Sequence, residues 1–212
     1  MSWQVGYALA NFNKSGPSKA EFVDGELIRI ATEGQPDVLA AISAAETMDQ
    51  ITAQYYVQTY PNLDFLCGFR ATCVWEGSAI AYLEASAVGW GSLGTLLSAA
   101  LDGSAKTASH KTYRFSDRLI RQYGRVARVD RDFDRIHRVH LRSGTTLRIG
   151  MVTDYEPNAD AVRALWDRFG PVDIVWNINP NGSLTPEAIE AGHGLGARVM
   201  KWDDLREYLR TA

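Results

Sequence analysis

Residues 135–152 read RIHRVHLRSGTTLRIGMV, and this stretch decides the fold that we expect for the second half of the chain. Apolar and polar residues alternate on both sides of Ser143 and Gly144, a pair typical of tight turns. Alternation with a period of two indicates half-buried strands. The stretch therefore predicts a β-hairpin, with strands over 135–141 and 145–152.

Helices and further strands are expected on both sides of this hairpin. Apolar residues recur at helical spacing before it and after it, and Thr185 with Pro186 is a typical start of a helix. In chain order we predict a helix over 114–123, the hairpin, a helix over 160–169, a strand over 172–176, a helix from Pro186 to Gly196, a strand over 197–200 and a helix over 203–209. Residues 112–212 are thus expected to form an α/β domain, a mixed sheet flanked by helices.

The first hundred residues give a weaker signal. Residues 19–34 carry apolar side chains near helical spacing, and a second helical candidate covers residues 36–57 and is stopped by Pro61. Residues 65–101 are apolar and broken by glycines, so they fit buried helices or central strands equally well. We expect a mostly helical or α+β region of unknown fold over 1–105. A polar segment, DGSAKTASH at 102–110, predicts a loop that ends it.

The overall composition is that of a globular protein of reducing surroundings. Hydrophobic residues make up 46% of the chain and charged residues 22%. Two cysteines, Cys67 and Cys73, are too few for a disulfide framework or a zinc site. The N-terminus lacks the pattern of a signal peptide, and no uninterrupted apolar run approaches the roughly 20 residues of a membrane span. We expect a cytoplasmic protein without a membrane partner.

Charge is distributed unevenly along the chain. Residues 1–100 carry ten acids and four bases, whereas residues 106–148 carry twelve bases and four acids, a net charge of +8. A basic sheet face next to a basic helix could follow the phosphate backbone of DNA or RNA. The candidate nucleic-acid-binding residues are Arg118, Arg121, Arg125, Arg138, Arg142 and Arg148. The alternative is that these arginines pair with the acidic N-terminal half or with another protein.

The C-terminal half resembles the Mrr-type branch of the restriction-endonuclease-like superfamily. The resemblance rests on the predicted element order and on two phrases, NGSLTPEA at 181–188 and GARVMKWDDL at 196–205. It covers roughly residues 112–212, and its best-matching phrases are structural. It implies a metal-binding Asp near the first strand of the hairpin and an acid two residues before a Lys on the next strand.

The resemblance places Asp134 at the metal-binding position, but the acid-x-Lys positions read Gly150, Met151 and Val152. An apolar triplet cannot hold Mg²⁺, which prefers oxygen ligands. Either the site is inactive or its residues have moved, and the candidates for a rearranged site are Asp132, Asp154, Glu156 and Lys201. If the protein is an enzyme, we expect a Mg²⁺-dependent nuclease, with Asp134 and Asp132 as the metal ligands. Asp130, Asp132 and Asp134 would share one face of a strand, either as a cation site or as a solvated edge that arginines neutralise.

Other motifs are weaker. Residues 89–94 read GWGSLG, formally a dinucleotide-binding loop, but packing glycines between buried elements are the more natural interpretation. The four histidines have no metal-ligand spacing. The leading hypothesis is a nucleic-acid-associated protein of bacterial defence or of a mobile element, on a nuclease-like fold that has lost catalysis. The alternatives are a non-enzymatic protein–protein interaction module, which includes self-association, a metal-dependent nuclease with a rearranged site, and a small-molecule-binding protein that uses the glycine-rich segment.

Overall fold

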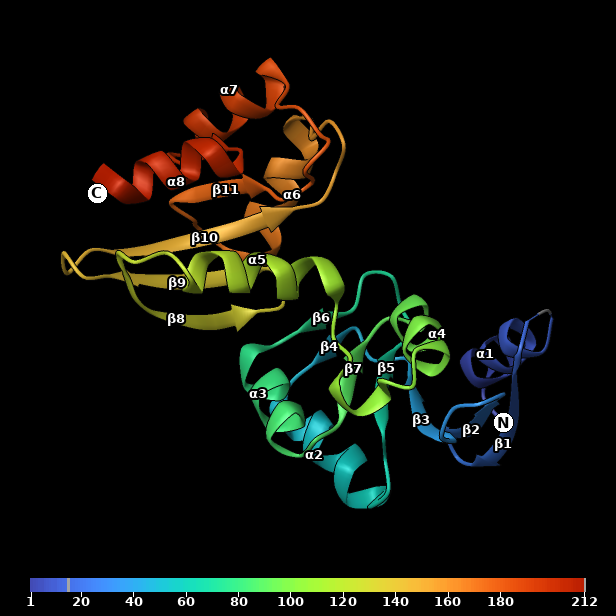
Figure 1. The fold of residues 1–212 in the computed structure, drawn as a ribbon. Helices are drawn as coiled ribbons and strands as arrows, with labels where there is room; N and C mark the ends of the chain where they lie inside the picture. The colour runs from blue at the N-terminus through green and yellow to red at the C-terminus, as the bar shows by residue number, and fades with distance from the viewer. Residues whose placement is uncertain (15, 212) are drawn as a thin grey trace. The chain divides into compact units, whose positions relative to one another are not determined.

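A computed structural model describes residues 1–14 and 16–211, with the side chains of Lys111 and Thr112 left out. The chain divides into two compact units, Met1–Lys111 (unit 1) and Thr112–Ala212 (unit 2), which are described separately. Both units are α/β folds built on a mixed sheet (Figure 1).

Unit 1 is a five-stranded sheet with helices on both faces. In chain order its elements are α1 (Trp3–Lys14), β1 (Ser18–Asp24), β2 (Leu27–Thr32), β3 (Val38–Ser43), β4 (Thr47–Met48), α2 (Gln50–Thr59), β5 (Phe65–Gly68), β6 (Val74–Trp75), α3 (Gly77–Ala85), β7 (Gly89–Gly91), α4 (Leu93–Leu101) and the 3-10 helix η1 (Ala105–Thr107). The strand order is β1-β2-β3-β5-β7, with the first three strands antiparallel and the last three parallel. Side chains of α1 and α4 pack on one face, and those of α2 and α3 on the other.

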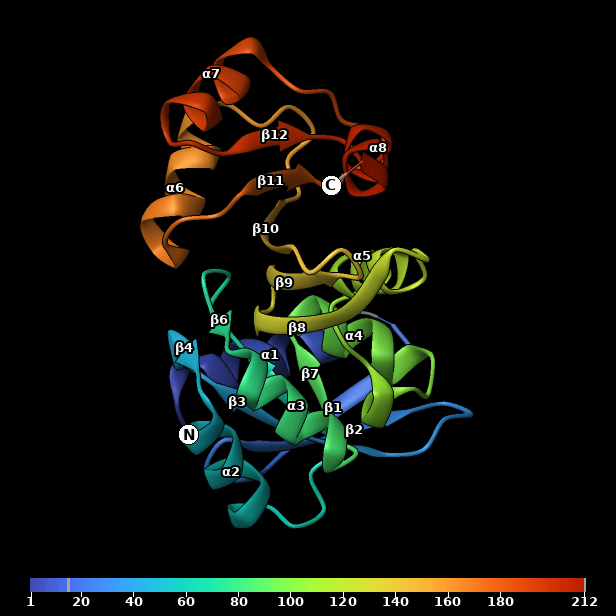
Figure 2. The ribbon, with the colours of Figure 1, turned by 90° about the vertical axis from the view of Figure 1, so that its left-hand side faces the viewer.

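Unit 2 has the same plan. Its elements are α5 (Lys111–Arg121), β8 (Val126–Phe133), β9 (Ile136–Leu141), β10 (Thr146–Val152), α6 (Ala159–Phe169), β11 (Ile174–Asn177), α7 (Pro186–Gly194), β12 (Arg198–Met200) and α8 (Trp202–Thr211). The strand order is β12-β11-β10-β9-β8, again with an antiparallel meander followed by parallel strands. Figure 2 shows α6 and α7 on one face of the sheet, with α5 and α8 on the other, where they share an apolar core.

The two units match residue by residue. The helix N-caps Asp49 and Asn158 lie 109 positions apart, and each accepts a hydrogen bond from the backbone N–H three residues on. The helix starts at Gly77 and Pro186 have the same spacing. So do the residues with positive φ after these helices, Ala87 and Gly196. The pairing of β2 with β3 and of β9 with β10 follows the same register.

No insertion or deletion separates the units between Lys19 and Leu101, whose equivalents are Arg128 and Arg210. Within this range only five pairs are identical in sequence, with Arg29, Asp64, Ala79, Ile80 and Leu96 repeated 109 positions later. This low identity explains why the sequence shows no repeat. The chain contains two copies of one topology.

The hairpin predicted over 135–152 is confirmed as β9 and β10, and the later helices and strands follow the predicted order. The prediction omitted β8 from that order. It is the edge strand of the sheet, and it ends at Phe133, so Asp134 lies in the following turn rather than on the strand with Asp130 and Asp132.

The helices predicted at 19–34 and at the start of 36–57 are wrong, because these residues form β1, β2 and β3. Gly25, with φ of 51°, makes the turn between β1 and β2, a conformation that glycine adopts easily. Apolar side chains at Leu27, Ile28 and Ile30 face the two packed layers of the sheet. β3 is buried on both faces, so its sequence has no clean period of two and can resemble a helix, whereas β2 does alternate, with Ile28 and Ile30 buried and Arg29 exposed.

Candidate functional site

Asp134, the predicted metal ligand, is buried in the turn between β8 and β9 with only 3% of its surface exposed. Its carboxylate receives two hydrogen bonds from the neighbouring Arg135, from Nη2 at 3.1 Å and from Nε at 3.3 Å. Arg135 in turn lies over two rings, with its guanidinium carbon 5.4 Å from the Tyr113 centroid and 5.8 Å from that of Phe169. The side chain of the next residue, Arg135, therefore neutralises the Asp134 carboxylate.

Tyr113 on α5 completes this corner of unit 2. Burial raises the pKa of its hydroxyl to about 12, while Arg135 opposes the rise and the charges of Asp134 and Asp154 add to it. Asp134 and Asp154 therefore act electrostatically on the same hydroxyl, although Asp154 is exposed beyond the end of β10. Of these two carboxylates, Asp134 has the Arg135 guanidinium as its counter-charge.

The other residues of the predicted rearranged site are engaged elsewhere. Glu156 accepts a hydrogen bond from the Ser183 hydroxyl at 3.3 Å. Lys201 donates from Nζ to the carbonyl oxygens of Asn179 and Gly182, both at 2.5 Å, so it fixes the turn between β11 and α7. Across residues 1–14 and 16–211, no three His, Cys, Asp or Glu side chains are grouped so that they could hold a metal ion.

Asp132, the second predicted metal ligand, lies in an ion-pair ladder on β8, β9 and β10. Its carboxylate is 3.1 Å from Arg138 and 3.1 Å from Arg148. Beside it, Asp130 is 2.6 Å from Arg128 and 2.9 Å from the ring of His140. This arrangement matches the interpretation of 130–134 as an edge whose acids are neutralised by arginines. The metal-binding role of Asp132 stays a prediction.

The six predicted nucleic-acid-binding arginines divide into two groups. Arg121, Arg138 and Arg148 each pair with a carboxylate, the first with Asp117 at 2.7 Å. For Arg118, Arg125 and Arg142 no ion pair is found within the described part of the chain. These three side chains are exposed.

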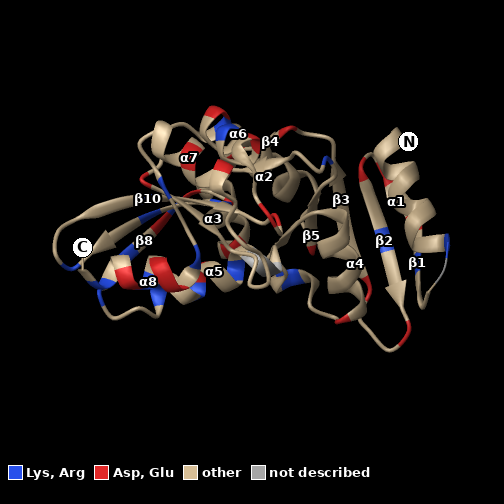
Figure 3. Cartoon of the chain, turned by 90° about the horizontal axis from the view of Figure 1, so that it is seen from above, with Lys and Arg blue, Asp and Glu red and all other residues tan. Residues whose placement is uncertain are grey.

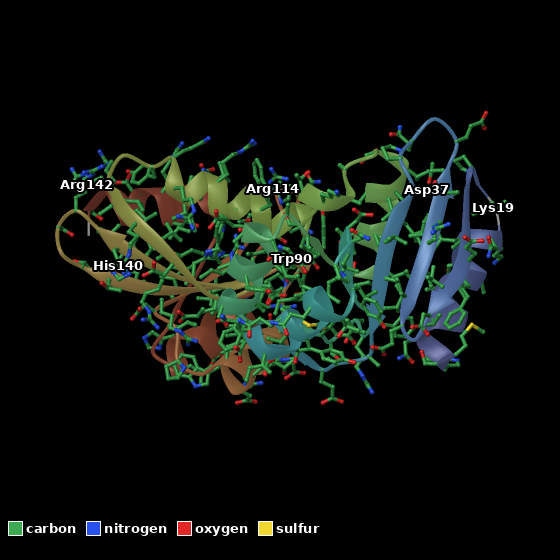
Figure 4. All side chains as sticks on the ribbon, turned by 90° about the horizontal axis from the view of Figure 1, so that it is seen from below. Lys19, Asp37, Trp90, Arg114, His140 and Arg142 are labelled. Atoms are coloured by element: carbon green, nitrogen blue, oxygen red, sulfur yellow. The ribbon has the colours of Figure 1, made fainter. Side chains whose placement is uncertain are left out.

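Arg118, Arg125 and Arg142 come from adjoining elements, and we call them the arginine patch. Arg142 follows β9, and its Nε donates to the carbonyl oxygen of Gly124 at 3.0 Å while its backbone N–H donates to Arg125 at 2.9 Å. Arg118 lies exposed in the last turn of α5, with its guanidinium carbon 6.0 Å from the Phe115 centroid. Figure 3 shows basic residues along α5 and the neighbouring strands, and Figure 4 shows the labelled Arg142 side chain pointing away from the ribbon.

Beneath this surface unit 2 buries a histidine. His137 on β9 is fully buried, and neither ring nitrogen has a hydrogen-bond partner among the described residues. The nearest acid is Asp117 on α5, with Oδ1 3.5 Å from Nδ1, and Arg121 and Arg131 flank that carboxylate. Burial lowers the pKa of His137 to about 4, against the opposing effect of Asp117.

The sequence prediction missed a polar cluster in unit 1. Glu26, just before β2, accepts hydrogen bonds from the Tyr56 hydroxyl and from Gln4 Nε2, the latter at 3.0 Å, and its backbone N–H donates to Tyr60. Burial raises the pKa of Tyr56, and Glu26 raises it further. Glu26 stands 109 positions before Arg135, so both units place a charged side chain at the same corner of the fold. Only the structural repeat would have pointed to it.

The glycine-rich segment contains the short strand β7 and the start of α4. A Cβ added at Gly89 would lie 1.9 Å from the carbonyl oxygen of Ala105, and Ser92 caps α4 by accepting a hydrogen bond from Thr95 N–H. β7 is the last strand of its sheet. Close packing therefore accounts for Gly89.

No protein-family model, curated protein or solved structure matches this chain. In the portion that the structure describes, no helix combines the length and apolar character needed to cross a membrane. The function must therefore be argued from the geometry of the chain.

Proposed function

We propose that the chain binds nucleic acid without sequence preference through the arginine patch of unit 2, on a restriction-endonuclease-like fold. What carries the proposal is that Arg118, Arg125 and Arg142 are exposed, adjoining and without an ion pair in the described residues, whereas Arg121, Arg138 and Arg148 are neutralised. Guanidinium groups that have no internal acid bind phosphate oxygens well.

The topology of unit 2 supports the proposal of a restriction-endonuclease-like fold. The resemblance implies a helix, a hairpin, a helix and a strand, and then a final strand and helix for residues 112–212, and unit 2 has these elements in that order with β8 as an additional strand before the hairpin. Asp134 lies in the turn two residues before β9, and Gly150, the first of the last three residues of β10, pairs with Ile136. The position that the resemblance assigns to the metal therefore has Asp134 beside an apolar strand end in this chain.

Removing the arginine patch should weaken nucleic-acid binding. We expect the Arg118→Ala, Arg125→Ala, Arg142→Ala triple variant to bind a labelled 20-base-pair duplex about tenfold or more weakly, because three phosphate contacts are lost. The slope of log affinity against log salt should flatten by about 2.7 units, at 0.9 per phosphate on B-DNA. Fluorescence anisotropy over 50 to 200 mM salt measures both quantities.

A matched control separates the patch from net charge. The Arg70→Ala, Arg163→Ala, Arg168→Ala variant removes the same charge from exposed positions elsewhere in the two units. It should keep the wild-type affinity and slope to within a factor of about two, apart from long-range effects that salt screens. Equal losses in the two triple variants, or no binding by the wild type at 50 mM salt, would refute the proposal.

We further expect no rapid metal-dependent cleavage. Gly150 and Val152 offer no charged group, and Arg135 occupies the Asp134 carboxylate. Loss of groups that act in the transition state commonly lowers rates by about two to three powers of ten each. Plasmid and single-stranded substrates incubated with Mg²⁺ or Mn²⁺ test this, with Asp134→Ala as the comparison. Rapid cleavage by the wild type that Asp134→Ala abolishes would instead establish a rearranged nuclease centre.

A further inference from the structure

The exposed side of α5 carries an aromatic ring next to the arginine patch. Phe115 is 52% exposed and stands three residues before Arg118, so both side chains lie on the same side of the helix. The guanidinium carbon of Arg118 is 6.0 Å from the centroid of the Phe115 ring. A cationic side chain of the patch and an exposed ring are therefore neighbours on one surface.

The first helix of each unit carries a ring at the same place. Each helix buries three residues with the same spacing, Val5, Ala8 and Phe12 in α1 and Tyr113, Ser116 and Ile120 in α5. Tyr7 and Phe115 each stand two positions after the first of these residues, and they are 48% and 52% exposed. The two rings are therefore equivalent in the structural repeat.

These equivalent rings have different neighbours. In unit 1, the Tyr7 ring packs against two rings of its own unit, with centroid distances of 5.7 Å to Trp3 and 5.5 Å to Phe69. Within the described part of the chain, no second ring packs against Phe115, whose neighbour is the Arg118 guanidinium. Unit 2 thus leaves this ring to a partner from outside the chain.

The chemistry of this surface selects the class of ligand. An exposed ring gains most from contact with another flat π system, whereas the adjoining guanidinium groups favour phosphate oxygens. Single-stranded nucleic acid offers both, because the faces of its unpaired bases are accessible beside the phosphates. In a duplex the bases are stacked on one another, and a base reaches a protein ring only after it leaves the stack.

We propose that the arginine patch binds single-stranded nucleic acid, with one base stacked on Phe115 and neighbouring phosphates bound by Arg118, Arg125 and Arg142. This inference rests on the proposed function and narrows its substrate class. Every base has a π face, so stacking adds affinity without adding sequence preference. The arginines supply the part of the affinity that depends on salt, and Phe115 supplies a part that does not.

The test measures binding of the full chain by fluorescence anisotropy to a labelled 20-nucleotide thymine strand, an abasic strand of equal length and a 20-base-pair duplex. The thymine strand should bind about tenfold or more tightly than the abasic strand, which keeps the phosphates and lacks the bases. At 200 mM salt it should also bind more tightly than the duplex. A uracil RNA strand distinguishes the two nucleic acids, because tighter binding than that of the thymine strand indicates contacts with the 2′-hydroxyl groups.

Variants of the ring isolate the stacking contact. Phe115→Ala and Phe115→Leu should each weaken binding of the thymine strand about tenfold and leave duplex binding within a factor of about two. The slope of log affinity against log salt should stay unchanged, because no phosphate contact is lost. Phe115→Trp keeps a ring and should keep the wild-type affinity. The matched control Phe22→Ala removes an exposed ring of unit 1 and should also bind like the wild type, with circular dichroism to show that each variant is folded.

The outcomes separate this inference from the proposed function. Equal affinity for the thymine and abasic strands, an unchanged affinity in Phe115→Ala, or tighter binding of the duplex at every salt concentration would overturn the stacking inference. In each of these cases, weaker binding by the triple variant of the arginine patch would still support nucleic-acid binding. If the full chain bound none of the strands at 50 mM salt, both the proposed function and this inference would fail.

Discussion

The free energy of unfolding of unit 2 should fall by about 3 kcal/mol as the pH drops from 6.5 to 4, because His137 is buried in its neutral form. The pKa of His137 is about 4 in the folded chain and near 6.5 when the ring is exposed by unfolding. Between these values the unfolded state binds a proton that the folded state does not, so acid favours unfolding. From about one pH unit above 6.5 both states are neutral, and this contribution does not change further.

Urea unfolding at several pH values, followed by the fluorescence of Trp166, Trp176 and Trp202 in unit 2, measures the effect. His137→Leu removes the titrating group from a site that already contains apolar neighbours, and it should flatten the pH dependence between 4 and 6.5. The control His193→Gln removes an exposed histidine and should leave the wild-type slope. If His137→Leu has the wild-type slope, or if NMR titration gives His137 an ordinary pKa, the prediction is wrong.

Substitution of Gly89 by alanine should destabilise unit 1 by about 3 kcal/mol or more, roughly a hundredfold in the unfolding equilibrium. The added Cβ would lie 1.9 Å from the Ala105 carbonyl oxygen and 3.0 Å from Phe65 Cδ2. The first of these is a backbone atom, so relief requires the segment around η1 to move rather than a side chain to rotate. The cause is crowding, since Gly89 has no positive φ.

The structural repeat provides the matched control. Arg198 is the equivalent of Gly89 in unit 2, where it is exposed and lies over the Tyr208 ring at 4.7 Å. Arg198→Ala should change stability by about 1 kcal/mol at most, as is usual for surface positions. Denaturant unfolding of both variants, with Trp75 and Trp90 fluorescence for unit 1, makes the comparison. An unchanged midpoint for Gly89→Ala would contradict the close contact with Ala105.

The sequence predicts unit 2 well and unit 1 poorly, for a physical reason. β9 carries Arg138 and His140 on a polar face and Val139 and Leu141 on an apolar one, so its period of two is visible. The strands β3 and β5 are buried on both faces by two helical layers, and their continuous apolar runs fit a helix as well as a strand.

The candidate site was harder to predict because contacts between strands and helices distant in sequence determine which arginines have an acidic partner. The sequence shows twelve basic residues in 106–148. It does not show that Asp132 forms ion pairs with Arg138 and Arg148, or that Asp117 forms one with Arg121. Those pairings give half of the predicted arginines an acidic partner within unit 2. The Glu26 cluster depends on Gln4, Tyr56 and Tyr60, which are distant in sequence and carry no motif.

The constant offset between equivalent residues of the two units determines which segments of the sequence can be exchanged between them. Because equivalent residues from Lys19 onward lie 109 positions apart, a segment such as β3 to β5 has a counterpart, β10 to β11, whose two junctions already fit in length. Recombination between the two halves of the gene would therefore exchange interior segments without creating gaps in the encoded backbone. At each equivalent position, one half shows a side chain that the shared topology already accommodates in the other half. Leu39 in unit 1 and Arg148 in unit 2 are one such pair.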